Sequence, residues 1–275
     1  MTAAILAFLF GLLIGSFLNV CIYRWPRDLS VVRPRSHCPS CEKPIAWYDN
    51  IPLLSYALLG GRCRQCRARI PIRYPAVELL TGLCFFYFVW TLGPALPAYK
   101  MCALAALLLA LLFCDLEERI LPDELTLGGA LAGLAFAFFV PTPDSTAQSL
   151  SWLAGVSLTG RSDWLAESVL GAVLPAALLW AGGWLFEKVR HREGLGFGDV
   201  KFMVMVGSFL GINGALLTLL LGSLAGSVLG YAYIWIARKD PKTYELPLGT
   251  FLSAAALVVA MAAPNSNRIS FFPGY

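Results

Sequence analysis

Long apolar runs, separated by short polar stretches, recur along nearly the whole of this 275-residue chain. Most are close to the ~20 residues that an α-helix needs to cross the hydrocarbon layer, so the pattern predicts membrane-spanning helices. The predicted spans are residues 2–23, 75–92, 98–114, 124–141, 165–186, 213–236 and 246–263. The apolar piece 200–211 is short for a span and is either a thin eighth crossing or a re-entrant helix. We therefore expect an all-α polytopic membrane protein with about eight transmembrane helices.

Composition and charge placement agree with this class. Hydrophobic residues make up 58% of the chain and charged residues 14%, and the mean hydropathy is +0.68. Basic residues cluster between the apolar runs instead of covering a soluble domain, which indicates membrane lipid and no nucleic acid as a partner. The first run lacks a basic n-region and is followed by Arg24 and Arg27, which predicts an uncleaved helix with its N-terminus outside the cytoplasm.

The positive-inside rule supports eight crossings. With the N-terminus outside, 18 of the 21 Lys and Arg residues fall in inner loops. The exceptions are Lys100, Arg161 and Arg268. A re-entrant 200–211 would move three more basic residues outside, which favours the crossing. This topology places Asp115 and Asp199 on the same, cytoplasmic side.

The first inner loop, residues 24–74, contains two CxxC pairs. Cys38 and Cys41 form the first, Cys63 and Cys66 the second, with 21 residues between the pairs. This spacing predicts a small zinc-binding domain with four thiolate ligands, whereas a cytoplasmic loop disfavours disulfides and redox dithiols would not need two copies. A loop of this size has little core, so Zn²⁺ is expected to supply much of its folding free energy.

Two polar residues lie within apolar helices. Asn19 and Glu78 need hydrogen-bond partners there. They either bond neighbouring helices for packing alone or hold a substrate backbone near a reaction centre, and the sequence leaves both interpretations open.

Two carboxylates are the candidate catalytic groups. Asp115 ends an apolar run, so it is the most dehydrated acid of its segment. Glu117 and Glu118 are expected in a solvated loop, and Asp123 suits an N-cap after Pro122, with Glu124 in the first turn of the next helix.

Asp199 follows the glycines Gly194, Gly196 and Gly198, which permit unusual backbone angles and close approach of another backbone. The spacing fits neither a dinucleotide fingerprint nor a phosphate loop. We expect Asp199 at or just before the start of a helix near Val200. If it meets Asp115, the two carboxylates can share a proton and activate water against a peptide carbonyl, as in aspartyl proteases.

Several motifs, taken in order, resemble one family. They are Gly15-Ser-Phe-Leu-Asn-Val20, the two CxxC pairs, Arg73-Tyr-Pro-Ala-Val-Glu78, Asp115 followed by Leu121-Pro-Asp123, and Gly196-Phe-Gly-Asp-Val-Lys201. Over about residues 11–260 the chain resembles the bacterial prepilin peptidases, or type 4 leader peptidases. The resemblance implies a bifunctional, multi-pass enzyme of the bacterial inner membrane with its active site on the cytoplasmic side. Such enzymes cut type IV prepilins or type II secretion pseudopilins after a glycine, then methylate the new N-terminal residue with S-adenosyl-L-methionine.

The resemblance also implies roles for residues of this chain. Asp115 and Asp199 are the implied catalytic pair, Gly61 is associated with methyl transfer, and the zinc ligands are Cys38, Cys41, Cys63 and Cys66. The residues expected to support the active site are Gly196, Gly198, Lys201, Asn19 and Glu78. We expect a first transmembrane helix at 1–23, the tetracysteine module at 24–74 and the peptidase domain at 75–275. The sequence does not indicate an oligomeric state.

Alternative functions would show different features or tolerate different substitutions. A membrane scaffold whose zinc knuckle docks a partner would tolerate Asn at positions 115 and 199. A peptidase without methyltransferase activity is a further alternative, although the tetracysteine loop favours methylation. A presenilin-type protease would carry a Tyr-Asp pair and a Pro-Ala-Leu motif, neither of which accompanies these aspartates. The spans contain no evident repeat of the kind common in transporters.

Overall fold

The computed structural model describes residues 1–142, 146–153, 155, 158–191, 196–238 and 246–266. These residues form helices and turns, and they contain no β-strand. The all-helical class expected from the apolar runs is therefore confirmed. The chain divides into two compact units, Met1–Ala110 and Leu111–Tyr275, which are described separately.

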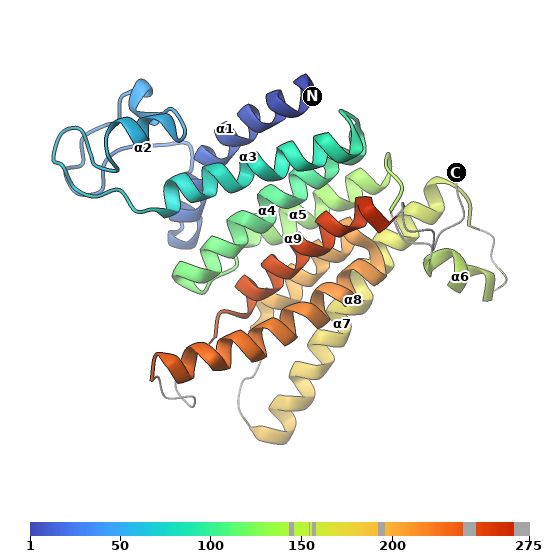
Figure 1. Cartoon of the computed structure of the whole chain (residues 1–275). Helices are drawn as coiled ribbons and strands as arrows, with labels where there is room; N and C mark the ends of the chain where they lie inside the picture. The colour runs from blue at the N-terminus through green and yellow to red at the C-terminus, as the bar shows by residue number, and fades with distance from the viewer. Residues whose placement is uncertain (143–145, 154, 156–157, 192–195, 239–245, 267–275) are drawn as a thin grey trace. The chain divides into compact units, whose positions relative to one another are not determined.

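In the first unit, α1 (Thr2–Arg24) packs beside α3 (Arg73–Leu92) (Figure 1). Small residues allow this close approach. A Cβ at Gly15 would lie 2.6 Å from the α-carbon of Glu78, and one at Gly11 would lie 2.8 Å from the α-carbon of Gly82. Glycine therefore sets the spacing of the two helices.

The unit also contains the first part of α4 (Leu96–Glu118). Lys100 is the fifth residue of α4 and is fully buried. Its expected place on the outer side of the membrane stays a prediction.

The loop between α1 and α3 contains three short helical segments. They are η1 (Trp25–Arg27), η2 (Trp47–Asn50) and α2 (Leu54–Leu58). Buried Arg24, at the end of α1, donates hydrogen bonds to the carbonyl oxygens of Ser30 at 2.8 Å and Pro34 at 2.7 Å. These bonds fix the start of the loop to α1.

The second unit contains the end of α4 and five further helices. They are α5 (Asp123–Ala137), α6 (Thr146–Leu153), α7 (Arg161–Arg190), α8 (Phe197–Ile236) and α9 (Leu248–Ser266). Helix α8 packs against α5, α7 and α9 (Figure 1). Gly171 of α7 faces Gly207 and Gly211 of α8, where a Cβ at Gly171 would lie 2.6–2.8 Å from backbone atoms, so only glycine fits this crossing.

Helix α8 changes direction at Gly211, whose φ of 76° and ψ of −171° are not helical (Figure 1). The predicted short piece 200–211 is thus joined to 213–236 through this kink. Buried Glu167 of α7 stabilises it, because its Oε1 accepts the Ile212 N–H at 3.1 Å. Its Oε2 accepts the Ala147 N–H at the start of α6. One carboxylate therefore caps two helical N-termini, where negative charge is favoured.

Among the described residues, five helices are long and apolar enough to cross a membrane. They are Thr2–Arg27, Arg73–Leu92, Leu96–Glu118, Arg161–Arg190 and Phe197–Ile236. The apolar part of α9, Leu248–Pro264, is shorter, and the 15 residues of α5 rise only about 23 Å against a hydrocarbon core of about 30 Å. The protein is thus a multi-pass membrane protein by its helices, and eight crossings stay a prediction.

Candidate functional site

The four cysteines of the CxxC pairs converge in the first unit. Their sulfur atoms all lie within 4.8 Å of one another, and the Sγ atoms of Cys38 and Cys66 are 3.8 Å apart. A tetrahedral zinc ion with Zn–S bonds of about 2.3 Å places its sulfurs about 3.8 Å apart. The cluster therefore fits the ion that the spacing predicted, and it could hold a metal.

Both pairs fold into the same backbone turn. The carbonyl oxygen of Cys38 accepts the Glu42 N–H at 2.8 Å, and that of Cys63 accepts the Arg67 N–H at 3.0 Å. The residue after each second cysteine has a left-handed backbone, with φ of 57° at Glu42 and 61° at Arg67. Backbone N–H groups of Cys66 and Gln65 lower the pKa of the Cys63 thiol to about 7. The pKa of the neighbouring Cys66 thiol is instead raised to about 11, so Cys63 is the one of these two that favours the thiolate, the metal-binding form.

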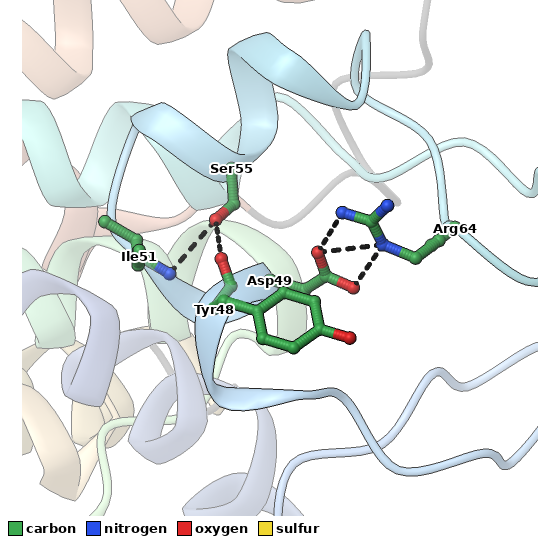
Figure 2. Close-up of polar contacts among 5 residues, drawn as sticks. All are labelled: Tyr48, Asp49, Ile51, Ser55 and Arg64. Atoms are coloured by element: carbon green, nitrogen blue, oxygen red, sulfur yellow. Dashed lines mark hydrogen bonds and ion pairs between the residues drawn. The ribbon is translucent and has the colours of Figure 1, made fainter.

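An ion pair ties the second turn to the rest of the module (Figure 2). Arg64 donates to the Asp49 carboxylate through Nη2 at 2.7 Å and through Nε at 2.8 Å. These hydrogen bonds lower the pKa of Asp49. Beside them, the Ser55 hydroxyl donates to the Tyr48 carbonyl oxygen at 2.8 Å and accepts the Ile51 N–H at 3.1 Å. Helices η2 and α2 are thereby joined to the cysteine cluster.

Gly61 lies two residues before Cys63 and has a φ of 65°. Its N–H donates to the Tyr56 carbonyl oxygen at 2.9 Å, and a Cβ there would lie 2.9 Å from the Tyr56 ring. The left-handed backbone and the close aromatic ring both favour glycine at this position. The association of Gly61 with methyl transfer stays a prediction.

A cavity of about 260 Å³ is lined by the module together with residues of α1 and α3, including Asn19 and Glu78. Asn19 Nδ2 donates to the carbonyl oxygens of Gly15 at 3.3 Å and Tyr74 at 3.0 Å. Glu78 Oε2 accepts the Leu53 N–H at 2.8 Å. Each residue thus forms hydrogen bonds with backbone groups, and both also line the cavity.

In the second unit, Asp115 lies in the last turn of α4 and is 6% exposed. Its Oδ2 accepts two hydrogen bonds from Thr250 near the start of α9, from the N–H at 2.5 Å and from Oγ1 at 2.8 Å. A Cβ at Gly249 would lie 3.0 Å from Asp115 Cγ. Neither Thr250 nor Gly249 was predicted as a site residue, because a Gly-Thr pair at the start of an apolar helix carries no mark of a contact with a distant acid.

Asp199 is the third residue of α8 and is half-buried. The helix begins at Phe197, slightly earlier than expected, after the N-cap residue Gly196. The Leu121 side chain lies beside both Gly198 and Gly249. A Cβ at Gly198 would lie 3.4 Å from this side chain, and a Cβ at Gly249 would lie 3.1 Å from it. Leu121 thus packs beside Gly198, the neighbour of Asp199, and beside Gly249, which borders Asp115, so the two predicted aspartates lie in the same region of the second unit. Gly194 lies outside the described residues.

The remaining acids of this region have other surroundings. Asp123 is the first residue of α5, so its prediction as N-cap was wrong by one position, while Glu124 in the first turn is confirmed. The Asp123 carboxylate forms an ion pair with Lys201, whose Nζ lies 2.7 Å from Oδ1 and 2.8 Å from Oδ2. The expected loop at Glu117 and Glu118 is instead the last turn of α4.

The chain matches two family models in succession. Residues 9–92 match the bacterial peptidase A24 N-terminal domain, and residues 102–231 match the type IV leader peptidase family. The second match contains both aspartates, and the first contains all four cysteines.

Curated relatives align over most of the chain. A prepilin leader peptidase/N-methyltransferase of Aeromonas hydrophila is 35% identical and covers 96% of this chain and 92% of its own length. The chain belongs to the type IV leader peptidase family. Another member, from Pseudomonas aeruginosa, is 33% identical over 94% of this chain and 90% of its own. A member from Myxococcus xanthus is 42% identical over 87% of this chain and 66% of its own. No solved structure matches this member of the family.

Proposed function

We propose that this protein is a bifunctional membrane enzyme. It removes the leader peptide from type IV prepilins or type II secretion pseudopilins after a glycine, and it then N-methylates the new N-terminal residue. The observation that carries the proposal is the alignment, over most of the chain, with relatives whose names state both activities. The two family domains divide the chain between the cysteine cluster and the aspartates.

Peptide cleavage is assigned to Asp115 and Asp199. One carboxylate takes a proton from water while the other, protonated, donates to the peptide carbonyl or the leaving amine. Burial of Asp115 and its bonds from Thr250 support a fixed orientation for this group. The placement of basic residues supports a cytoplasmic active site in a bacterial inner membrane. In this proposal Lys201 acts through its pairing with Asp123, and Gly196 and Gly198, which have no side chains, leave the backbone beside Asp199 open to substrate.

Methyl transfer is assigned to the first unit. Zn²⁺ held by the four cysteines would stabilise the module at 24–74, between the helix at 1–23 and the peptidase domain at 75–275. S-adenosyl-L-methionine would supply the methyl group. Gly61 would maintain the turn that leads into the second cysteine pair.

Mass spectrometry of a prepilin incubated with the purified protein tests both activities. We expect loss of the leader without added donor, and a further gain of one methyl group when S-adenosyl-L-methionine is present. A prepilin that stays intact under both conditions would favour the membrane scaffold. Cleavage without methyl gain would identify a peptidase alone.

A further inference from the structure

The cavity in the first unit has two buried hydrogen-bond acceptors on its helical side. Asn19 is 2% exposed and Glu78 is 8% exposed. Both lie near the loop-facing ends of their helices, where α1 and α3 pack closely at Gly15. This cavity belongs to the unit with the cysteine cluster, whereas both catalytic aspartates belong to the other unit.

The Asn19 side chain has a defined orientation. Its Nδ2 faces two carbonyl oxygens, those of Gly15 and Tyr74, so the amide oxygen must occupy the other position. Within the described residues, this Oδ1 is buried and has no hydrogen-bond partner. An unsatisfied buried acceptor costs about 1–3 kcal/mol, so a donor on a ligand would recover this energy.

Glu78 is a buried carboxyl group that can ionise. Its Oε2 accepts the Leu53 N–H at 2.8 Å. In the part of the chain that the structure describes, it forms no ion pair with Lys or Arg. A buried charge without a counter-charge is unfavourable. The site therefore suits a cationic ligand group that carries several donors.

The basic residues that line the cavity do not fill this role. Arg24 donates to backbone oxygens, and Arg64 pairs with Asp49. Lys43 and Arg69 lie in the cysteine turns. The other titratable residues of the lining are His37, Cys38, Cys63, Tyr23, Tyr48, Tyr56 and Tyr74. The rings of Tyr23 and Tyr74 on the helical side are already covered by Arg27 and Arg73. The groups left to recognise a cationic ligand there are the two acceptors, Asn19 Oδ1 and the Glu78 carboxylate.

We propose that Asn19 and Glu78 bind the free α-amino group of the cleaved pilin, and that Glu78 takes the proton which this amine loses before methylation. The inference rests on the methyltransferase activity proposed above. An α-ammonium group presents three N–H donors, enough for Asn19 Oδ1 and the Glu78 carboxylate together. Once Glu78 holds one proton, the nitrogen lone pair forms the N–CH₃ bond. The C–S bond of the sulfonium donor breaks toward sulfur, leaving a neutral thioether and a protonated secondary amine.

Peptide binding tests the site without requiring methyl transfer. The probes are two synthetic peptides with the N-terminal sequence of a mature pilin, one with a free amine and one acetylated. We expect the wild-type protein to bind the free-amine peptide about 10- to 100-fold more tightly than the acetylated one. This is the size of effect that hydrogen bonds to a charged group produce. Glu78→Gln and Asn19→Leu, both close in shape to the natural residues, should reduce or remove this preference.

Thr81→Ala is the matched control, because Thr81 is equally buried in α3 but donates to the Val77 carbonyl oxygen and does not line the cavity. It should keep the preference for the free amine. Metal content and thermal midpoint establish that each variant is folded. Equal binding of both peptides by the wild type, or an unchanged preference in Glu78→Gln, would overturn the inference.

Two further measurements separate this site from its alternatives. If Glu78→Gln weakens binding of S-adenosyl-L-methionine and leaves peptide binding unchanged, the acceptors recognise the donor's sulfonium, and the assignment to the amine is wrong. If the wild type prefers the free amine but transfers no methyl group, the amine site stands and the methyltransferase proposal fails. In the expected case, Glu78→Gln methylates pre-cleaved pilin about 100-fold more slowly, as for loss of a general base.

Discussion

Thr250→Val removes one hydrogen bond from Asp115 and leaves the other in place. The Thr250 hydroxyl donates to Asp115 Oδ2 at 2.8 Å, while its distance to the Leu112 carbonyl oxygen is 3.4 Å, so the carboxylate is the better acceptor. Valine has the same shape, and its backbone N–H can still donate to Oδ2. The substitution therefore changes a single interaction of the proposed catalytic group.

A hydrogen bond to a charged group contributes about 1.5–3 kcal/mol, which corresponds to a fall in rate of about 10- to 150-fold. We expect this loss in kcat for prepilin cleavage, followed by gel or mass spectrometry, with methylation of pre-cleaved pilin unchanged. Thr250→Ser keeps the hydroxyl and should retain most activity. Thr218→Val is the matched control, since buried Thr218 donates to Gly214 of its own helix. Cleavage by Thr250→Val within about twofold of wild type, or equal losses in Thr250→Val and Thr218→Val, would refute a role in holding Asp115.

Three further predictions concern the metal, the kink and the ion pair. Chelation of the metal, or Cys63→Ser, should open new protease sites within residues 24–72 and abolish methylation; an unchanged digestion pattern would contradict a structural metal. Glu167→Ala leaves two buried N–H groups without their acceptor, so SDS titration should report a loss of about 2–6 kcal/mol in the free energy of unfolding. Glu167→Gln should lose less, and equal stability of the Ala variant and wild type would exclude the cap. The Asp49–Arg64 pair is largely exposed on its Arg64 side, so a double-mutant cycle on thermal unfolding should give only a weak coupling. Arg64 lowers the pKa of the Asp49 carboxyl in the folded protein. The stabilisation from the pair is therefore complete at pH values above the pKa of Asp in the unfolded chain, about 3.9. It is lost only as the pH falls through the lower pKa that Asp49 has in the folded protein. The coupling should thus be equal at pH 7 and 5.5, and its disappearance by pH 5.5 would contradict the assigned shift.

The sequence pattern predicted those helices and sites that depend only on neighbouring residues. Apolar length alone placed α1 and α3 almost to the residue, and CxxC spacing identified the four sulfurs that converge. The start of α8 at Phe197 and the first-turn position of Asp199 lay within a few residues of expectation.

Features that depend on distant contacts were not predictable in this way. The kink at Gly211 lies inside an apolar run, and the carboxylate that caps it belongs to Glu167, 45 residues before its hydrogen-bond donor Ile212. Thr250 and Asp115 are 135 residues apart, and nothing beside Thr250 marks it as a partner of an acid. Lys201 was assigned to the active site from its motif, but its ion pair with Asp123 depends on how α5 packs against α8.

The central claim is that one chain carries two separate sites, one that cleaves and one that methylates. Asp115→Asn and Asp199→Asn test it most directly, when each purified variant receives both an intact prepilin and a pre-cleaved pilin together with S-adenosyl-L-methionine. We predict that neither variant removes the leader and that both still add one methyl group to the pre-cleaved pilin. Normal cleavage by both variants would contradict the aspartyl mechanism, and loss of both activities in well-folded variants would contradict the separation of the sites.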